Sequence, residues 1–215
     1  IRAVDVVCCT CSAAGDSKLV KHAFPFVIVD EAGRALEPDI VVPMTLGCQW
    51  LVLVGDHRQI GPTVTSRSLV HSGLGVSLFE RLTMAGVVPL MLEVQYRMHP
   101  ELSAYPSVAF YDGRLRDGVT AQQRVSGLTL KQPWNSPLAF LHSATPEFRT
   151  ASSSFSNAGE ADMVLKLLGI LLEGGVSGGD VAVITPYDAQ RQYLRGKISA
   201  RYGAIGVDVD SVDAF

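Results

Sequence analysis

The sequence predicts an α/β fold built on parallel sheets. Along its 215 residues, short β-branched apolar runs alternate with longer stretches of helical character, and this order is typical of strand-helix-strand units. The runs are continuously apolar rather than alternating, which predicts strands covered on both faces. The runs expected to form strands are 4–9, 26–29, 51–54, 89–94, 138–141, 181–184 and 207–212.

Between these runs, residues 77–86 and 157–175 are predicted to be helices, because apolar residues recur at helical spacing and glycines follow. A helix stop and a proline within 81–90 predict a domain boundary near residue 87, dividing the chain into domains 1–87 and 88–215. The Ser- and Thr-rich stretch 143–157 predicts an exposed loop in the second domain.

Composition is that of a packed globular protein, with 47% hydrophobic and 18% charged residues. A net charge of −3 provides no overall basic field, so any nucleic-acid site must be local. The sequence has no apolar run long enough for a membrane span and no signal-peptide pattern, so we expect a cytoplasmic protein.

The chain has four cysteines, three of them in the segment VVCCTC. Zinc is the weaker interpretation of this cluster, because Cys48 has no nearby Cys or His to complete a second ligand pair. The stronger interpretation treats Cys8 and Cys9 as small apolar residues of a buried strand.

Polar residues follow many of the predicted strands. In open parallel sheets, ligands bind outside the carboxyl ends of the strands, so these residues are candidates for one shared site. They are Thr10, Asp30 and Glu31, Gly55 to Gln59, Gln95 to Arg97, and Thr185 to Tyr187.

This set contains the parts of a nucleoside-triphosphate hydrolysis site. An Asp can hold Mg²⁺ through its waters, a neighbouring Glu can take a proton from the attacking water, and Gln and Arg can orient that water and neutralise developing charge. Each part alone has an ordinary structural explanation, such as a helix cap for Asp30 and Glu31 or a turn for Gly55 and Asp56. The combination in this order favours hydrolysis.

Several segments resemble motifs of the superfamily-1 RNA/DNA helicases in the order of that family: VDEAG, VGDHRQIGP, VQYRMHP, ITPYDAQ and SVDAF. The segments VVCCTCSAAGD, SLFERL, GVTAQQRV and NAGEADMV are similar to the helicases of nonsense-mediated mRNA decay. The resemblance covers nearly the whole chain. It implies two RecA-like P-loop NTPase domains, both incomplete here.

The resemblance also implies roles for individual residues. Asp30 would serve Mg²⁺ through water, Glu31 would be the general base, and Gln59 would contact the γ-phosphate and the attacking water. Arg97 would be an arginine finger and Tyr96 would stack on adenine. Gly55, Asp56 and Glu160 would line the nucleotide cleft, whereas Thr10, Thr185 and Pro186 would touch the RNA sugar-phosphate backbone, contacts that carry no base information.

The implied protein is an ATP- and Mg²⁺-dependent helicase that moves on single-stranded RNA, or less favourably DNA, as a monomer with protein partners of mRNA decay. One alternative is a non-catalytic RNA-binding or scaffold module. A metal-dependent nuclease is weaker still, because such enzymes collect three or more carboxylates around paired ions.

The sequence departs from the family in important places. The phosphate-binding pattern G-x-x-x-x-G-K-[ST] is absent, since Gly196-Lys197 is followed by Ile198. Gly33 and Arg34 replace a more polar pair, and the chain stops at Phe215 where the family continues. We therefore expect residues 1–215 alone to hydrolyse little ATP and to expose apolar sheet surface.

Overall fold

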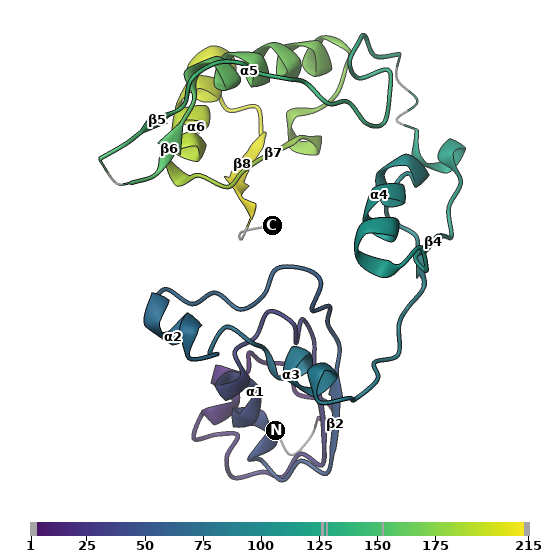
Figure 1. Cartoon of the computed structure of the whole chain (residues 1–215), viewed down its shortest axis with the longest axis vertical. Helices are drawn as coiled ribbons and strands as arrows, with labels where there is room; N and C mark the ends of the chain where they lie inside the picture. Colours follow the sequence, from purple (N-terminus) through teal and green to yellow (C-terminus); the bar gives the residue numbers. More distant parts are fainter. Residues whose placement is uncertain (1–3, 126, 128, 152, 213–215) are drawn as a thin grey trace. The chain divides into compact units, whose positions relative to one another are not determined.

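The computed structural model describes residues 4–125, 127, 129–151 and 153–212. The chain divides into two compact units, unit 1 (Ile1–Met91) and unit 2 (Leu92–Phe215). Each unit combines helices with small parallel sheets, so the predicted α/β class is confirmed at this level (Figure 1).

Unit 1 is built on a parallel pair of strands, β1 and β2, in a register that runs from Phe26↔Trp50 to Val29↔Leu53. Its elements in chain order are η1 (Ser12–Gly15), β1 (Phe26–Val29), α1 (Glu37–Met44), β2 (Trp50–Leu53), α2 (Arg67–His71) and α3 (Leu78–Met84). One face of the pair packs into a core that includes Val27, Val29, Ile40 and Leu78. The core thus joins the sheet to α1 and α3.

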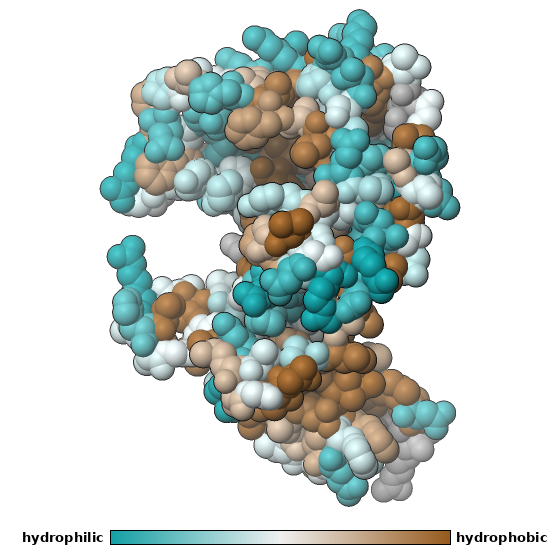
Figure 2. All heavy atoms as spheres, turned by 45° about the vertical axis from the view of Figure 1, so that its right-hand side comes forward, coloured by the Kyte–Doolittle hydropathy of each residue, from teal (hydrophilic) through white to brown (hydrophobic). Residues whose placement is uncertain are grey.

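The other face of this sheet is open, so the prediction of strands covered on both faces is wrong for β1 and β2. Phe26 is 72% exposed and Trp50 is 65% exposed, and their rings stack with centroids 6.4 Å apart. Ile28 and Val52 also face outward. The apolar sheet surface that we expected is therefore present, and Figure 2 shows hydrophobic residues gathered over part of unit 1.

Unit 2 contains separate pairs of strands. The parallel pairs are β3 (Val94–Gln95) with β4 (Arg116–Asp117) and β7 (Ala182–Thr185) with β8 (Asp208–Ser211), and the antiparallel pair is β5 (Phe148–Arg149) with β6 (Phe155–Ser156). Its helices and turns are α4 (Pro100–Tyr111), η2 (Ala121–Arg124), α5 (Ala158–Glu173), η3 (Gly178–Asp180) and α6 (Asp188–Tyr202).

The main core of unit 2 lies where α5 and α6 pack with the β7–β8 pair (Figure 1). Its buried residues are Ala161, Leu165, Leu168, Leu194, Ile198 and Val209. Helix α5 begins where the side chain of Asn157 accepts a hydrogen bond from the Glu160 N–H at 3.0 Å, and it ends at Glu173, followed by Gly174 as the C-cap. This cap fixes the start of α5, which lines the pocket described below.

Several predicted strands are absent. Residues 4–9 and 138–141 form no strand, and the run 89–94 contributes only Val94 to β3. Apolar character alone does not make a strand, because its backbone groups need a neighbouring strand to bond. Cys8 and Cys9 are exposed rather than buried in a strand. The loop predicted at 143–157 contains the β5–β6 hairpin.

Within the described ranges, no group of three or more His, Cys, Asp and Glu side chains has an arrangement that could hold a metal ion. No helix in this part of the chain is both long and apolar enough to cross a membrane.

Candidate functional site

The loops that follow β1 and β2 lie at the same edge of the unit 1 sheet, because parallel strands end on the same side. Hydrogen bonds extend the strand pairing into these loops, from Val54 N–H to the Val29 carbonyl and from Ala32 N–H to the Val54 carbonyl, both 2.8 Å. The first loop carries Asp30 and Glu31, and the second carries Asp56 and Gln59. The structure therefore brings these two predicted groups to one edge.

Two glycines allow the loops to pack backbone against backbone. A Cβ added to Gly33 would lie 2.7 Å from the Asp56 carbonyl oxygen, and one added to Gly55 would lie 2.6 Å from the Gly33 nitrogen. Real Cβ contacts are not that short, so both positions require glycine. Gly33 is one of the positions at which the sequence departs from the helicase pattern. The structure gives a steric reason for this glycine, which the sequence alone did not supply.

Glu31 has an unusual backbone conformation. Its φ is 53°, in the left-handed region that a Glu rarely adopts. The Asp30 carboxylate accepts a hydrogen bond from the Glu31 N–H at 3.0 Å, and the Glu31 carbonyl accepts one from Arg34 N–H at 2.9 Å. The turn therefore presents two adjacent, exposed carboxylates in a strained conformation of the kind that is concentrated at functional sites.

Asp56 organises the second loop. Its carboxylate accepts hydrogen bonds from the Arg58 N–H at 2.9 Å and from the Gln59 side-chain amide at 2.8 Å. The Gln59 amide is thereby held on the loop that packs against Gly33. Asp56 thus acts as a support for Gln59 in this structure.

Tyr96 and Arg97 follow β3 in unit 2. The Gln95 side-chain oxygen accepts hydrogen bonds from the N–H groups of Arg97 at 2.9 Å and Met98 at 2.7 Å, and the Gln95 amide donates to Asp117 at 2.6 Å. Arg97 is exposed, and none of the carboxylates that the structure describes pairs with its guanidinium. The backbone of this loop is therefore held by hydrogen bonds, while the Arg97 guanidinium is exposed and can bind a ligand.

The carboxylate of Asp117 supports the same loop. Hydrogen bonds from the Ser103 hydroxyl at 2.6 Å and from Gln95 lower the pKa of Asp117 below its ordinary value. Next to it, Gly118 lies against the ring of Tyr96, so closely that a Cβ at this position would overlap the ring. The orientation of the Tyr96 ring therefore depends on a glycine that the sequence analysis did not single out.

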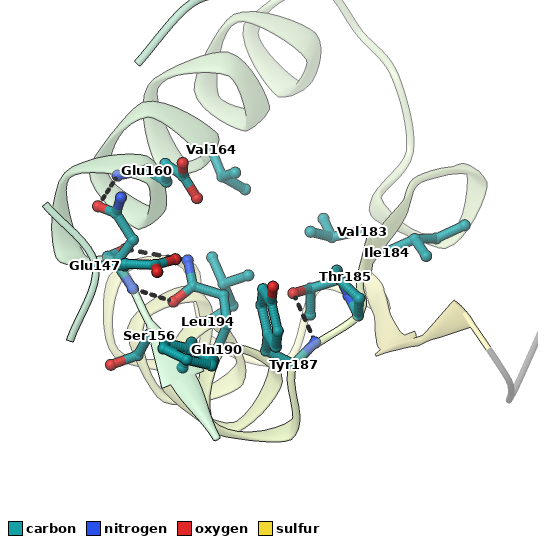
Figure 3. A pocket seen from close by; sticks show the side chains of 13 residues that line it. Glu147, Ser156, Glu160, Val164, Val183, Ile184, Thr185, Tyr187, Gln190 and Leu194 are labelled. Atoms are coloured by element: carbon teal, nitrogen blue, oxygen red, sulfur yellow. Dashed lines mark hydrogen bonds between the residues drawn. The ribbon is translucent and has the colours of Figure 1, made fainter. Parts of the chain in front are cut away.

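A cavity of about 330 Å³ lies in unit 2 between the start of α5, the end of β7 and the first turns of α6. Figure 3 shows Glu160, Thr185, Tyr187 and Glu147 around it. The structure thus brings Glu160 together with Thr185 and Pro186, residues that the resemblance had assigned to different ligands. Sequence analysis missed Glu147, because this residue does not directly follow a predicted strand.

Buried amide hydrogen bonds hold the wall of this pocket. The Gln190 side chain accepts from the Asn157 N–H at 2.8 Å and donates to the Asn157 carbonyl at 3.0 Å. Thr185 is only 7% exposed, and its hydroxyl accepts from the Tyr187 N–H at 3.3 Å. The wall of the pocket is therefore fixed by hydrogen bonds between buried groups.

The charge of the pocket is negative. It contains the carboxylates of Glu147 and Glu160, whereas none of its lining residues is Lys, Arg or His. A phosphate group inside it would be repelled, while hydroxyl or amino donors would be accepted. Thr10 belongs to unit 1, where its hydroxyl accepts from the Ala13 N–H at 3.2 Å at the start of η1.

Apart from Thr10, the predicted site residues therefore fall into three sets, each within one unit. Unit 1 contributes Asp30, Glu31, Asp56 and Gln59, and unit 2 contributes the Tyr96–Arg97 loop and the pocket at Glu160. The convergence of Arg97 on the unit 1 residues remains a prediction.

Comparison with known proteins gives consistent matches over the chain. One family model described as an AAA domain matches residues 74–215, and a second with the same description matches residues 1–67. A Regulator of nonsense transcripts 1 homolog from Drosophila melanogaster is 42% identical over 100% of this chain and 19% of its own length. Regulator of nonsense transcripts 1 from Caenorhabditis elegans is also 42% identical, over 100% of this chain and 21% of that protein.

The ATP-dependent helicase upf1 of Schizosaccharomyces pombe is 42% identical over 100% of this chain and 24% of its own length. These names confirm the resemblance that the motifs indicated. The chain spans only about a fifth of the length of these curated relatives.

Proposed function

Because the chain belongs to the AAA domain family, we propose that it is part of an ATP-dependent RNA helicase. In this proposal the protein couples ATP hydrolysis to movement on single-stranded RNA during nonsense-mediated mRNA decay. The observation that carries it is the packing of the Asp30–Glu31 loop on the Asp56–Gln59 loop through Gly33 and Gly55. The proposal treats residues 1–87 and 88–215 as the later part of one RecA-like domain and most of a second.

The carboxylates of unit 1 suit a hydrated magnesium ion. One oxygen of Asp30 accepts from the Glu31 N–H, and the carboxylate is exposed to solvent. Mg²⁺ keeps several of its waters and takes few protein carboxylates, so a single exposed Asp fits it. When bound, the ion would neutralise phosphate charge. Glu31 would take the proton of the attacking water, and Gln59, held by Asp56, would orient that water.

Unit 2 would supply the positive charge near the transferred phosphoryl group and the aromatic contact with the adenine ring. The Arg97 guanidinium would stabilise the charge that develops on the transferred phosphoryl group. Tyr96 is 64% exposed, so its side chain is accessible for stacking on adenine. Residues 1–215 lack the phosphate-binding loop, so we expect weak nucleotide binding and negligible hydrolysis by this chain alone.

RNA contact in unit 2 is proposed for the rim of the Glu160 pocket, near Thr185 and Pro186. Because the pocket is negatively charged, the part of RNA that enters it would be ribose hydroxyls or base amino groups rather than phosphate. The proposed protein acts as a cytoplasmic monomer, and its protein partners belong to mRNA decay.

The test is RNA-stimulated phosphate release and RNA affinity, measured on the same preparations of full-length protein. Arg97→Ala should lower turnover by about 10³–10⁵ and leave RNA affinity nearly unchanged. Arg97→Lys should rescue poorly, because an ammonium lacks the planar fork of donors. Near-normal turnover in Arg97→Ala would remove the arginine-finger role. RNA binding by a wild-type protein that never hydrolyses ATP would instead favour the non-catalytic scaffold.

A further inference from the structure

We propose that Arg124 is a positioning residue for Arg97, and that it acts by holding the backbone carbonyl groups of Tyr96 and Arg97. The inference rests on the proposed function, in which Arg97 supplies charge to the reaction. It concerns contacts within unit 2 only.

The guanidinium of Arg124 bridges η2 to the loop after β3. Its Nε donates to the Arg97 carbonyl oxygen at 3.0 Å, and its Nη2 donates to the Tyr96 carbonyl oxygen. Arg97 and Arg124 are 27 residues apart in sequence, so this is a tertiary contact. No local sequence pattern predicts it.

The same short segment is held from its other side by Gln95. The Gln95 side-chain oxygen accepts from the Arg97 and Met98 N–H groups at 2.9 and 2.7 Å. The N–H of Arg97 is thus bonded to one side chain and its carbonyl to another. A backbone restrained at both groups, with an exposed guanidinium, is the arrangement that electrostatic preorganisation requires.

Arg124 is itself presented by a restrained turn. Thr120 and Gln123 form a reciprocal capping box at the start of η2, in which the Thr120 N–H donates to the Gln123 side-chain oxygen at 2.8 Å. The guanidinium of Arg124 also donates through Nη1 to the Gln123 carbonyl at 3.2 Å. The position of the Arg124 fork is therefore set by the turn as well as by its acceptors.

The contact depends on the shape of the guanidinium rather than on its charge alone. Among the described residues, no carboxylate forms a salt bridge with Arg124, and its fork is used on two neighbouring carbonyl groups. A lysine would keep the charge but could not reproduce this planar geometry. Arg124→Lys therefore separates positioning from a general electrostatic effect.

A first experiment measures the loop directly in the 215-residue chain. Arg124→Ala should raise amide hydrogen exchange of Arg97 and Met98 about tenfold, while the Leu168 amide in α5 keeps its rate. Arg201→Ala is the control, because the Arg201 guanidinium lies over the ring of Tyr202 on α6. Unchanged exchange at Arg97 and Met98 in Arg124→Ala would overturn the proposal.

A second experiment uses steady-state kinetics of the full-length protein. Arg124→Ala should lower kcat about 10²-fold, less than loss of Arg97 itself, with little change in KM for ATP. In an Arg97→Ala background, Arg124→Ala should have no further effect, because a residue that acts only through Arg97 has nothing left to position. Arg124→Lys should restore little of the lost kcat.

The outcomes distinguish this inference from the proposed function. A further loss of kcat in the double variant, or full rescue by Arg124→Lys, would show that Arg124 acts otherwise and would overturn the proposal. If wild-type protein shows no RNA-stimulated hydrolysis, the proposed function fails, and the exchange experiment still decides whether Arg124 holds the loop. If Arg124→Ala does not fold, exchange at Arg97 and Met98 in Arg124→Lys decides, with faster exchange expected.

Discussion

Gly33 packs directly on the backbone of Asp56, so closely that a Cβ on Gly33 would lie 2.7 Å from the Asp56 carbonyl oxygen. This contact joins the loop that carries Asp30 and Glu31 to the loop that carries Gln59. The atom in the way is backbone and not the end of a flexible side chain, so it cannot move aside without shifting the second loop.

Gly33→Ala should therefore lower the free energy of unfolding by about 1–3 kcal/mol, measured by urea denaturation. Gly75→Ala is the matched control in unit 1, because nothing lies within 4 Å of a Cβ added there. Equal stability of the two variants would show that the loops are not packed as described.

Glu31→Gly should stabilise the fold by up to about 1 kcal/mol. Glycine adopts a φ near 53° without the steric cost that Glu31 carries. Glu31→Ala keeps that cost and should leave stability close to wild type, which makes it the control. Thermal unfolding of the three proteins provides the comparison, and a less stable Glu31→Gly would argue against strain at this turn.

In the full-length protein, both Glu31 variants should lose hydrolysis if Glu31 is the general base. A glycine that raises stability and abolishes turnover would identify the carboxylate as a functional group kept at a conformational cost. Turnover near the wild-type rate in either variant would remove Glu31 from that role.

Gln190→Ala should destabilise unit 2 by about 2–3 kcal/mol. The substitution leaves the buried Asn157 N–H without its partner. It also removes one of the hydrogen bonds to the Asn157 carbonyl, which still accepts from the Ala161 N–H at 3.1 Å. Gln192→Ala is the control on the same helix, because Gln192 is exposed and its side-chain amide donates to the Asp188 carboxylate at 2.7 Å. Denaturant midpoints that do not differ between these variants would contradict the role of Gln190 in the pocket wall.

Because of Asp117, part of the stability of unit 2 should be lost at low pH. Hydrogen bonds from Ser103 and Gln95 lower its pKa in the folded state. The stabilisation is therefore complete above its ordinary pKa of 3.8 and is lost as the pH falls through the lower pKa of the folded protein. The thermal midpoint of wild type minus that of Asp117→Asn should be constant above pH 3.8 and should decrease as the pH falls below 3.8. A difference that does not change with pH would show that the charge of Asp117 is not involved.

Sequence by itself determined the parts of this protein that depend on neighbouring residues along the chain. The apolar runs at 26–29, 51–54 and 181–184 correspond to β1, β2 and β7 within about a residue at each end, and the patterns at 77–86 and 157–175 contain α3 and α5. Motif order also predicted which loops carry the proposed site residues. These features are local, because strand and helix periodicity and turn chemistry act over a few residues.

Tertiary structure decided everything that depends on contacts between distant residues. The runs 4–9 and 138–141 are apolar but pair with no strand in the described part of the chain, and β1 and β2 are covered on one face only. The steric need for Gly33, the grouping of Glu160 with Thr185, and the contact of Arg124 with Arg97 each join segments far apart in sequence. Hydrophobic burial and hydrogen bonding act between whatever atoms the fold brings together, so only the folded chain specifies these partners.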